Sequence, residues 1–97
     1  MKLVLSVDAK ADIVAIHSFG SQRWGRARSA IYIDALRDSI KALVRGDISG
    51  VAAGHVRPEI RQLAVGSHVI WYRIDGDKLR VLRVLHQRMD AAVWVGS

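Results

Sequence analysis

A compact polar cluster directly follows the most apolar stretch near the C-terminus. Residues 81–85 are almost entirely aliphatic, and the next five positions are His86, Gln87, Arg88, Met89 and Asp90. A histidine exchanges a proton near neutral pH, and an arginine binds a phosphate or carboxylate through two parallel hydrogen bonds. A strand that ends in this cluster can therefore present fixed polar groups to a substrate or to a protein partner.

One chemistry open to these residue types is RNA cleavage without a metal ion. In that reaction a base activates the 2′-hydroxyl group, and cations stabilise the charge that develops on the phosphate. As a nuclease, the chain would draw its site from two strands and the polar cluster, that is, from Arg61, Arg73, His86 and Arg88.

We favour a simpler role for each of these four side chains. A histidine at a strand end commonly hydrogen-bonds to its own backbone, and arginines on strands cover apolar neighbours with their stems. Arg88 and Asp90 would form a local ion pair that stabilises the C-terminal turn by less than about 1 kcal/mol if exposed. On this interpretation no residue is catalytic.

Several classes of protein are excluded by what the sequence lacks. There is no cysteine, so thiolate chemistry and disulfides are absent, which is compatible with a reducing cytoplasm. The four histidines are scattered, without the spacing of metal ligands, and no phosphate-binding or dinucleotide glycine motif is present. We therefore expect no metal and no cofactor. The apolar runs are too short to span a membrane, and no signal peptide opens the chain.

The chain length and net charge indicate one small basic domain, residues 1–97. The formal charge is +6, and 11 of the 15 basic residues are arginine. Such a balance predicts a nucleic-acid, nucleoprotein or acidic-protein partner. A soluble surface rich in arginine through codon bias explains the composition equally well.

The spacing of apolar residues predicts the order β-α-α-β-β-β. We expect a strand over 2–7, a helix that Ser6 caps, a break at Gly25 and a second helix over 26–45. A loop over 46–58 precedes strands over 60–65, 68–74 and 78–86, with tight turns at 66–67 and 75–77. The fold class is therefore α/β in the α+β sense, with an N-terminal α-hairpin on a small, twisted, mainly antiparallel sheet.

The sheet face opposite the helices is the expected place for contact residues. Some members of the set Trp71, Arg73, Arg83 and His86 should lie there, although a tryptophan such as Trp71 more often serves core or cross-strand packing. The apolar tail over 91–95, with Trp94, either folds back on the core or docks on another chain.

Four stretches resemble the ParE-type toxins of the RelE/ParE superfamily, and together they cover nearly the whole chain. They are residues 5–13 (LSVDAKADI), 32–36 (YIDAL), 57–73 (RPEIRQL followed by GSHVIWYR) and 84–90 (VLHQRMD), the last being the most specific. Each motif alone is weak, but their order and spacing fit the family.

The resemblance implies the toxin half of a type II toxin–antitoxin module. A ParD-like antitoxin would neutralise it in a hetero-oligomer, a heterotetramer or larger, in the cytoplasm. The implied target is DNA gyrase, which ParE-type toxins trap with its DNA broken, without sequence-specific DNA binding by the toxin itself. Candidate contact residues for target or antitoxin are Arg61, Trp71, Arg73, Arg83, His86, Arg88, Met89 and Trp94.

Two alternatives remain open at this point. RelE-type relatives cut mRNA on the ribosome with basic residues and a C-terminal tyrosine or histidine. This chain keeps Arg61 and His86 at comparable places but has no tyrosine after Tyr72. The other alternative is a homologue that still binds its antitoxin but has lost its toxicity.

Overall fold

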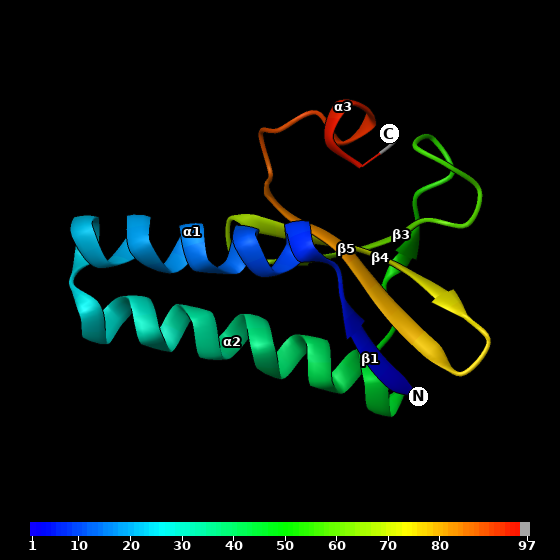
Figure 1. Ribbon diagram of the computed structural model, residues 1–97, viewed down its shortest axis with the longest axis horizontal. Coiled ribbons are helices and arrows are strands. Elements are labelled where there is room, and N and C mark those ends of the chain that lie inside the picture. The colour runs from blue at the N-terminus through cyan, green and yellow to red at the C-terminus, as the bar shows by residue number, and fades with distance from the viewer. Residues whose placement is uncertain (96–97) are drawn as a thin grey trace.

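The computed structural model describes residues 1–95 and confirms the predicted order of elements (Figure 1). Two short elements were not predicted, a strand within the loop 46–58 and a helix in the apolar tail. The elements are β1 (Lys2–Leu5), α1 (Val7–Trp24), α2 (Arg26–Arg45), β2 (Val51–Ala52), β3 (Arg61–Val65), β4 (His68–Asp75), β5 (Lys78–His86) and α3 (Ala91–Trp94).

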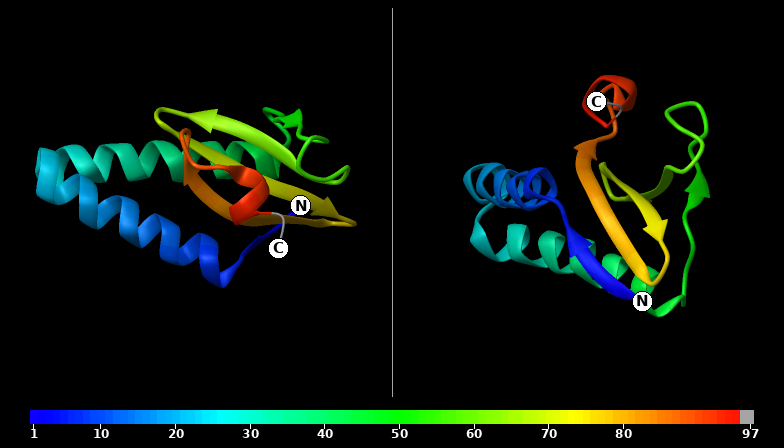
Figure 2. Two further views of the ribbon diagram at one scale, coloured as in Figure 1. Left: turned by 90° about the horizontal axis from the view of Figure 1, so that it is seen from above. Right: turned by 45° about the vertical axis from the view of Figure 1, so that its right-hand side comes forward.

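The five strands form one sheet in the order β1-β5-β4-β3-β2. β1 runs parallel to β5, and all other neighbours are antiparallel. The hairpin of α1 and α2 covers one face, whereas α3 and the segment that precedes β3 lie on the other side (Figure 2). Within residues 1–95 no helix is long and apolar enough to cross a membrane.

The ends of the two long helices follow from capping chemistry. The Ser6 hydroxyl accepts a hydrogen bond from the Ala9 N–H at 2.9 Å and donates one to the Leu82 carbonyl at 2.7 Å. It therefore both starts α1 and fixes it to β5. Gly25, with φ of 89°, separates α1 from α2, as predicted from the sequence.

The β4–β5 pair contains a bulge that changes which residues of β5 face the helices. Trp71 pairs with Arg83 and Tyr72 pairs with Val81, so Leu82 is an extra residue on β5. Upstream of Leu82 the odd-numbered residues face the helices, and downstream the even-numbered ones do. As a result His86 lies on the face that carries the helices.

The main core fills the space between the hairpin and the sheet. It is made by the apolar stripes of both helices and by the helix-facing residues of β4 and β5: Ala9, Ile13, Ile33, Leu36, Ile40, Leu43, Ile70, Tyr72, Leu79, Val81 and Val84. Burial of each large side chain of this kind stabilises the fold by about 1.5–3 kcal/mol.

A second, smaller core lies on the opposite face of the sheet. It joins the sheet to the loop before β3 and to α3 through Ala53, Ile60, Trp71, Leu85, Ala91 and Val95. Trp71 is only 6% exposed, so a partner cannot reach it on the folded chain. The prediction of Trp71 as a contact residue is therefore corrected, because the tail folds back over this face.

Candidate functional site

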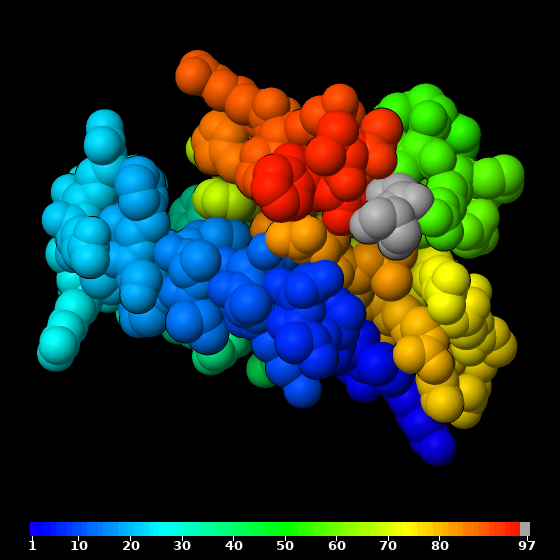
Figure 3. All heavy atoms as spheres, turned by 45° about the horizontal axis from the view of Figure 1, so that its top comes forward, coloured from blue at the N-terminus to red at the C-terminus, as the bar shows by residue number. Residues whose placement is uncertain are grey.

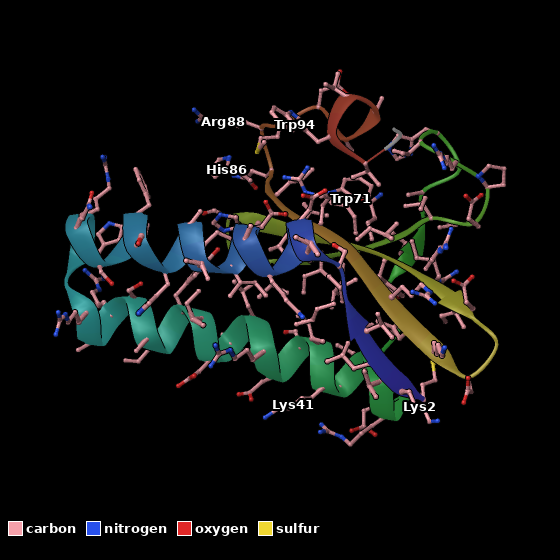
Figure 4. All side chains as sticks on the ribbon, viewed as in Figure 1. Lys2, Lys41, Trp71, His86, Arg88 and Trp94 are labelled. Carbon is pink, nitrogen blue, oxygen red and sulfur yellow. The ribbon has the colours of Figure 1, made fainter. Side chains whose placement is uncertain are left out.

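The predicted site residues lie at two ends of the sheet rather than at one place. His86 pairs with His68 at one end, whereas Arg61 pairs with Tyr72, four positions further along β4. At the rise of an extended strand this separation is about 13 Å. His86 and Arg88 lie close together in Figure 4, far from Lys2 at the other end of the sheet.

Arg61 and Arg73 each have a local structural partner. Arg61 donates a 2.7 Å hydrogen bond to the Gly50 carbonyl, which secures the loop before β3. Arg73 lies 3.0 Å from Asp75, on the sheet face opposite His86. The four residues considered for RNA cleavage therefore do not converge on one phosphate. This correction arises because the register places Arg73 on the other face and Arg61 at the other end.

Arg83 joins three elements and is only 18% exposed. It donates two 2.8 Å hydrogen bonds to the Asp12 carboxylate on α1, and its guanidinium lies 5.6 Å from the centre of the Trp94 ring. The hydrogen bonds to Asp12 raise the pKa of Arg83 above its ordinary value, so it stays charged. Its main role is to link α3 and α1 to β5, so little of its guanidinium group is free to contact a partner.

The polar cluster that follows β5 orders the turn that leads into α3. His86 accepts a hydrogen bond at Nδ1 from the Arg88 N–H, the local role expected of a strand-end histidine. Asp90 caps α3 by accepting from the Ala92 N–H at 3.0 Å. The expected Arg88–Asp90 ion pair is wrong, because within residues 1–95 that carboxylate serves the helix.

One exposed surface, the C-terminal surface, consists of Arg88, Met89, Val93 and Trp94. Met89 is 37% exposed, Val93 63% and Trp94 46%. Ala91 and Val95 are buried beneath them in the second core, so the tail folds back and also presents an apolar outer side. Apolar groups exposed on a fixed element are typical of protein interfaces.

A polar contact that the sequence did not predict lies behind His86. The Tyr32 hydroxyl on α2 is 2.6 Å from Nδ1 of His68, and the His68 and His86 rings are 5.5 Å apart. Burial, and secondarily the charge of His86, lower the pKa of His68 below 6.5. Tyr32 and His68 are 36 residues apart, and no local pattern in the sequence links them.

An apolar groove crosses the hairpin beside the free edge of β1. Its volume is about 390 Å³, with an aliphatic floor and a basic rim, and its lining residues are Leu3, Leu5, Lys10, Ile13, Val14, Arg37, Ile40 and Lys41. No carboxylate lines the groove among the described residues. Its chemistry suits an amphipathic segment with acidic side chains.

In the described part of the chain, no three histidine, aspartate or glutamate side chains lie close enough together to hold a metal ion. The structure contains three surfaces of interest: the end of the sheet with His86 and Arg88, the apolar groove on the hairpin, and the C-terminal surface. All three are suited to binding.

Comparison with known proteins identifies the family. Residues 3–91 match the family model described as the ParE toxin of the type II toxin–antitoxin system parDE. The chain is 37% identical over 92 residues to Toxin ParE1 of Caulobacter vibrioides, covering 95% of each chain. It is 36% identical over 90 residues to Toxin ParE1 of Mycobacterium tuberculosis, covering 92% of each chain.

A solved structure agrees on the fold. A chain of the chromosomal ParDE toxin–antitoxin system from P. aeruginosa superimposes with a TM-score of 0.77, covering 89% of this chain and 95% of that one, at 21% identity. With the fold, the order of elements and the sequence match in agreement, the chain belongs to the ParE toxin family of type II toxin–antitoxin systems.

Proposed function

We propose that this toxin inhibits DNA gyrase by binding to it through the C-terminal surface, without catalysing a reaction. The observation that carries the proposal is the exposure of Val93 and Trp94 on a helix held against the core, and of Arg88 and Met89 in the turn that precedes it. A binding surface that is already ordered loses little conformational entropy when a partner docks.

The anchoring contacts support a binding role for this surface. Arg83 holds Trp94 from below, and Asp90 caps the helix that carries it. Trp and Met side chains are enriched among interface residues, and a half-exposed Trp on an ordered helix is a typical anchor. Arg88 adds a positive charge for an acidic partner.

The separation of the predicted nuclease residues also supports a non-catalytic toxin. Arg61 and Arg73 serve the loop and the β4–β5 end, about 13 Å or more from His86. A cleavage site needs its groups within hydrogen-bond reach of one phosphate.

The apolar groove is the proposed site for a ParD-like antitoxin. Leu5, Ile13 and Ile40 supply the floor, and Lys10 and Lys41 supply positive charge at the rim. An acidic amphipathic segment of the antitoxin would bury its apolar side there and pair with the rim. The free edge of β1 lies beside the groove and gives the complex a route to a larger hetero-oligomer in the cytoplasm.

A gyrase supercoiling assay tests the proposed target. Purified toxin should abolish supercoiling and cause cleaved DNA to accumulate. Trp94→Ala should weaken inhibition by roughly tenfold or more, as expected of an interface anchor. Val51→Ala is the control, since Val51 is exposed on β2, an element that contributes no residue to the C-terminal surface, and should leave inhibition unchanged.

The purified toxin and its induction in cells together separate the alternatives. Full supercoiling at excess toxin would overturn the gyrase proposal. New mRNA ends in translated codons after induction would instead indicate a ribosome-dependent nuclease, and normal growth without antitoxin would indicate lost toxicity.

A further inference from the structure

A hollow of about 440 Å³ lies between the hairpin end of α1 and the end of the sheet that carries His86. Its lining comes from α1, α2, the β3–β4 turn and the segment after β5: Ile16, Phe19, Arg23, Trp24, Tyr32, Ser67, His68, His86 and Arg88. In Figure 3 the segment after β5, in orange, stands apart from the hairpin end of α1. Apart from Arg88, the gyrase and antitoxin proposals use none of the residues that line this hollow.

The floor of the hollow consists of connected hydrogen-bonding groups. The Tyr32 hydroxyl contacts Nδ1 of His68 at 2.6 Å and accepts a hydrogen bond from the Ser67 N–H at 2.9 Å. His86 lies against His68 with ring centres 5.5 Å apart. These contacts hold two imidazoles side by side at the bottom of an open space.

The charged groups around this floor are all cationic. Arg23 and Arg88 contribute to the rim, and neither forms an ion pair within residues 1–95. No aspartate or glutamate is among the lining residues. An adjoining hollow of about 520 Å³ shares Trp24, Tyr32 and Ser67 and adds Arg28. Two arginines and two histidines around one space fit a phosphate group.

The wall of the hollow is aromatic and open to solvent. Phe19 is 59% exposed and Trp24 is 48% exposed, and their rings meet edge to face at 6.4 Å between centres. Arg23 lies 5.9 Å from the centre of the Phe19 ring. Exposed aromatic rings beside a cationic groove are the arrangement on which nucleobases stack.

We propose that this hollow binds a nucleotide, with its phosphate between Arg88, Arg23 and the two histidines and its base against Trp24. A volume of about 440 Å³ lies in the range of small-ligand pockets. The nucleotide is either free or one unit of a single strand, since both present the same phosphate and base. The proposal stands independently of gyrase binding, because it concerns the isolated toxin and shares only Arg88 with the C-terminal surface.

Acidic pH should strengthen this binding. The groups that face His68 are Tyr32 on α2, His86 on β5, and Arg23 and Arg88 at the rim, with no carboxylate among them. Without a ligand, burial and His86 keep the pKa of His68 below 6.5. A bound phosphate favours the charged imidazole, so affinity should rise as the pH falls below that value.

The experiment titrates the isolated toxin with 5′-AMP, inorganic phosphate, adenosine or a short oligothymidylate, and follows by NMR the Trp24 indole N–H and the backbone amides of Ser67 and Arg88, which also report on variants without Trp24. AMP should shift the Trp24 signal and bind more tightly than phosphate or adenosine. Arg88→Gln should weaken AMP about tenfold, the loss expected for one charge-assisted hydrogen bond. Trp24→Ala should weaken AMP about tenfold and leave phosphate unaffected.

Lys2→Gln is the control for charge alone. Lys2 lies at the opposite end of the molecule (Figure 4) and should change AMP affinity less than about twofold. Each variant replaces an exposed side chain, and matching urea midpoints verify folding. Tighter binding of the oligonucleotide than of AMP would assign the site to a single strand, and the reverse would assign it to a free nucleotide.

Three results would overturn the proposal. They are no change in the Trp24 signal at millimolar AMP, equal affinity for AMP and inorganic phosphate, and equal weakening by Lys2→Gln and Arg88→Gln.

Discussion

The Asp12–Arg83 pair should contribute more to stability than any other ion pair in the described part of the chain. The Asp12 carboxylate accepts three hydrogen bonds, two from Arg83 at 2.8 Å and one from the Val84 N–H at 2.9 Å. The side chains of Arg83 and Asp12 are 18% and 14% exposed. Asp12→Ala would leave the guanidinium largely buried and without its carboxylate.

The expected loss follows from these contacts. Removal of one partner from a fully buried pair costs about 3–5 kcal/mol, and partial exposure reduces that figure. We therefore expect Asp12→Ala to lower the free energy of unfolding by about 2–4 kcal/mol. That is a large part of the 5–15 kcal/mol that typically stabilises a small domain.

Urea denaturation measures this loss as a shift in midpoint at constant slope. Asp47→Ala is the matched control, because the Arg45–Asp47 pair is also 2.8 Å long but both side chains are 60% exposed. It should cost less than about 1 kcal/mol. Adding Arg83→Met to Asp12→Ala should restore about 1–3 kcal/mol by removing the unpaired charge.

Two outcomes would refute this reasoning. One is a loss below about 1 kcal/mol for Asp12→Ala, within the range of an exposed pair. The other is a double variant no more stable than Asp12→Ala alone. Because the hydrogen bonds to Asp12 raise the pKa of Arg83, the arginine is charged at neutral pH in both the folded and the unfolded chain, so results at pH 6 and pH 8 should agree on this pair.

Three further predictions follow from buried polar contacts. Burial and the charge of His86 lower the pKa of His68, so the stability that neutral His68 contributes is complete above pH 6.5 and is lost as the pH falls through the lower pKa of the folded chain. The urea midpoint of His68→Gln should therefore change less than that of the parent between pH 6.5 and that lower pKa. Tyr72→Phe removes the 2.8 Å hydrogen bond from the Gly50 N–H and should cost about 1–3 kcal/mol in the same assay; unchanged stability would show that water replaces the hydroxyl. Ser6→Ala should cost about 0.5–2 kcal/mol and speed amide exchange in the first turn of α1; protection equal to the parent would contradict the capping role.

Much of the fold could be predicted because its signals are local. The stripe Ile33, Leu36, Ile40 and Leu43 is fully buried, and α2 spans the predicted residues 26–45. β5 also has its predicted bounds, since a turn signal before the apolar run and a polar cluster after it mark where the strand begins and ends. β2 was missed because a strand of two residues carries no periodic signal.

The site was harder to predict because it depends on contacts distant in sequence. The Tyr32–His68 hydrogen bond spans 36 residues. The burial of Trp71 depends on where the tail folds, and no pattern around Trp71 reveals this. Residue types suggested basic and aromatic binding chemistry, but the register decided which of these residues meet.

The single extra residue in β5 lets two neighbouring residues share one side of the sheet. Val81 and Val84 both face the helices, so Leu82 and Arg83 lie between them on the other side, where Leu82 packs on the second core and Arg83 contacts Asp12 and Trp94. Deletion of Leu82 would return the strand to regular alternation and leave the flanking pairs in place, with Tyr72 opposite Val81, Trp71 opposite Arg83 and His68 opposite His86. A one-residue deletion at Leu82 would therefore remove packing beneath α3 and keep the hollow, whereas the same deletion at a regular position of β5 would turn every later residue to the opposite face.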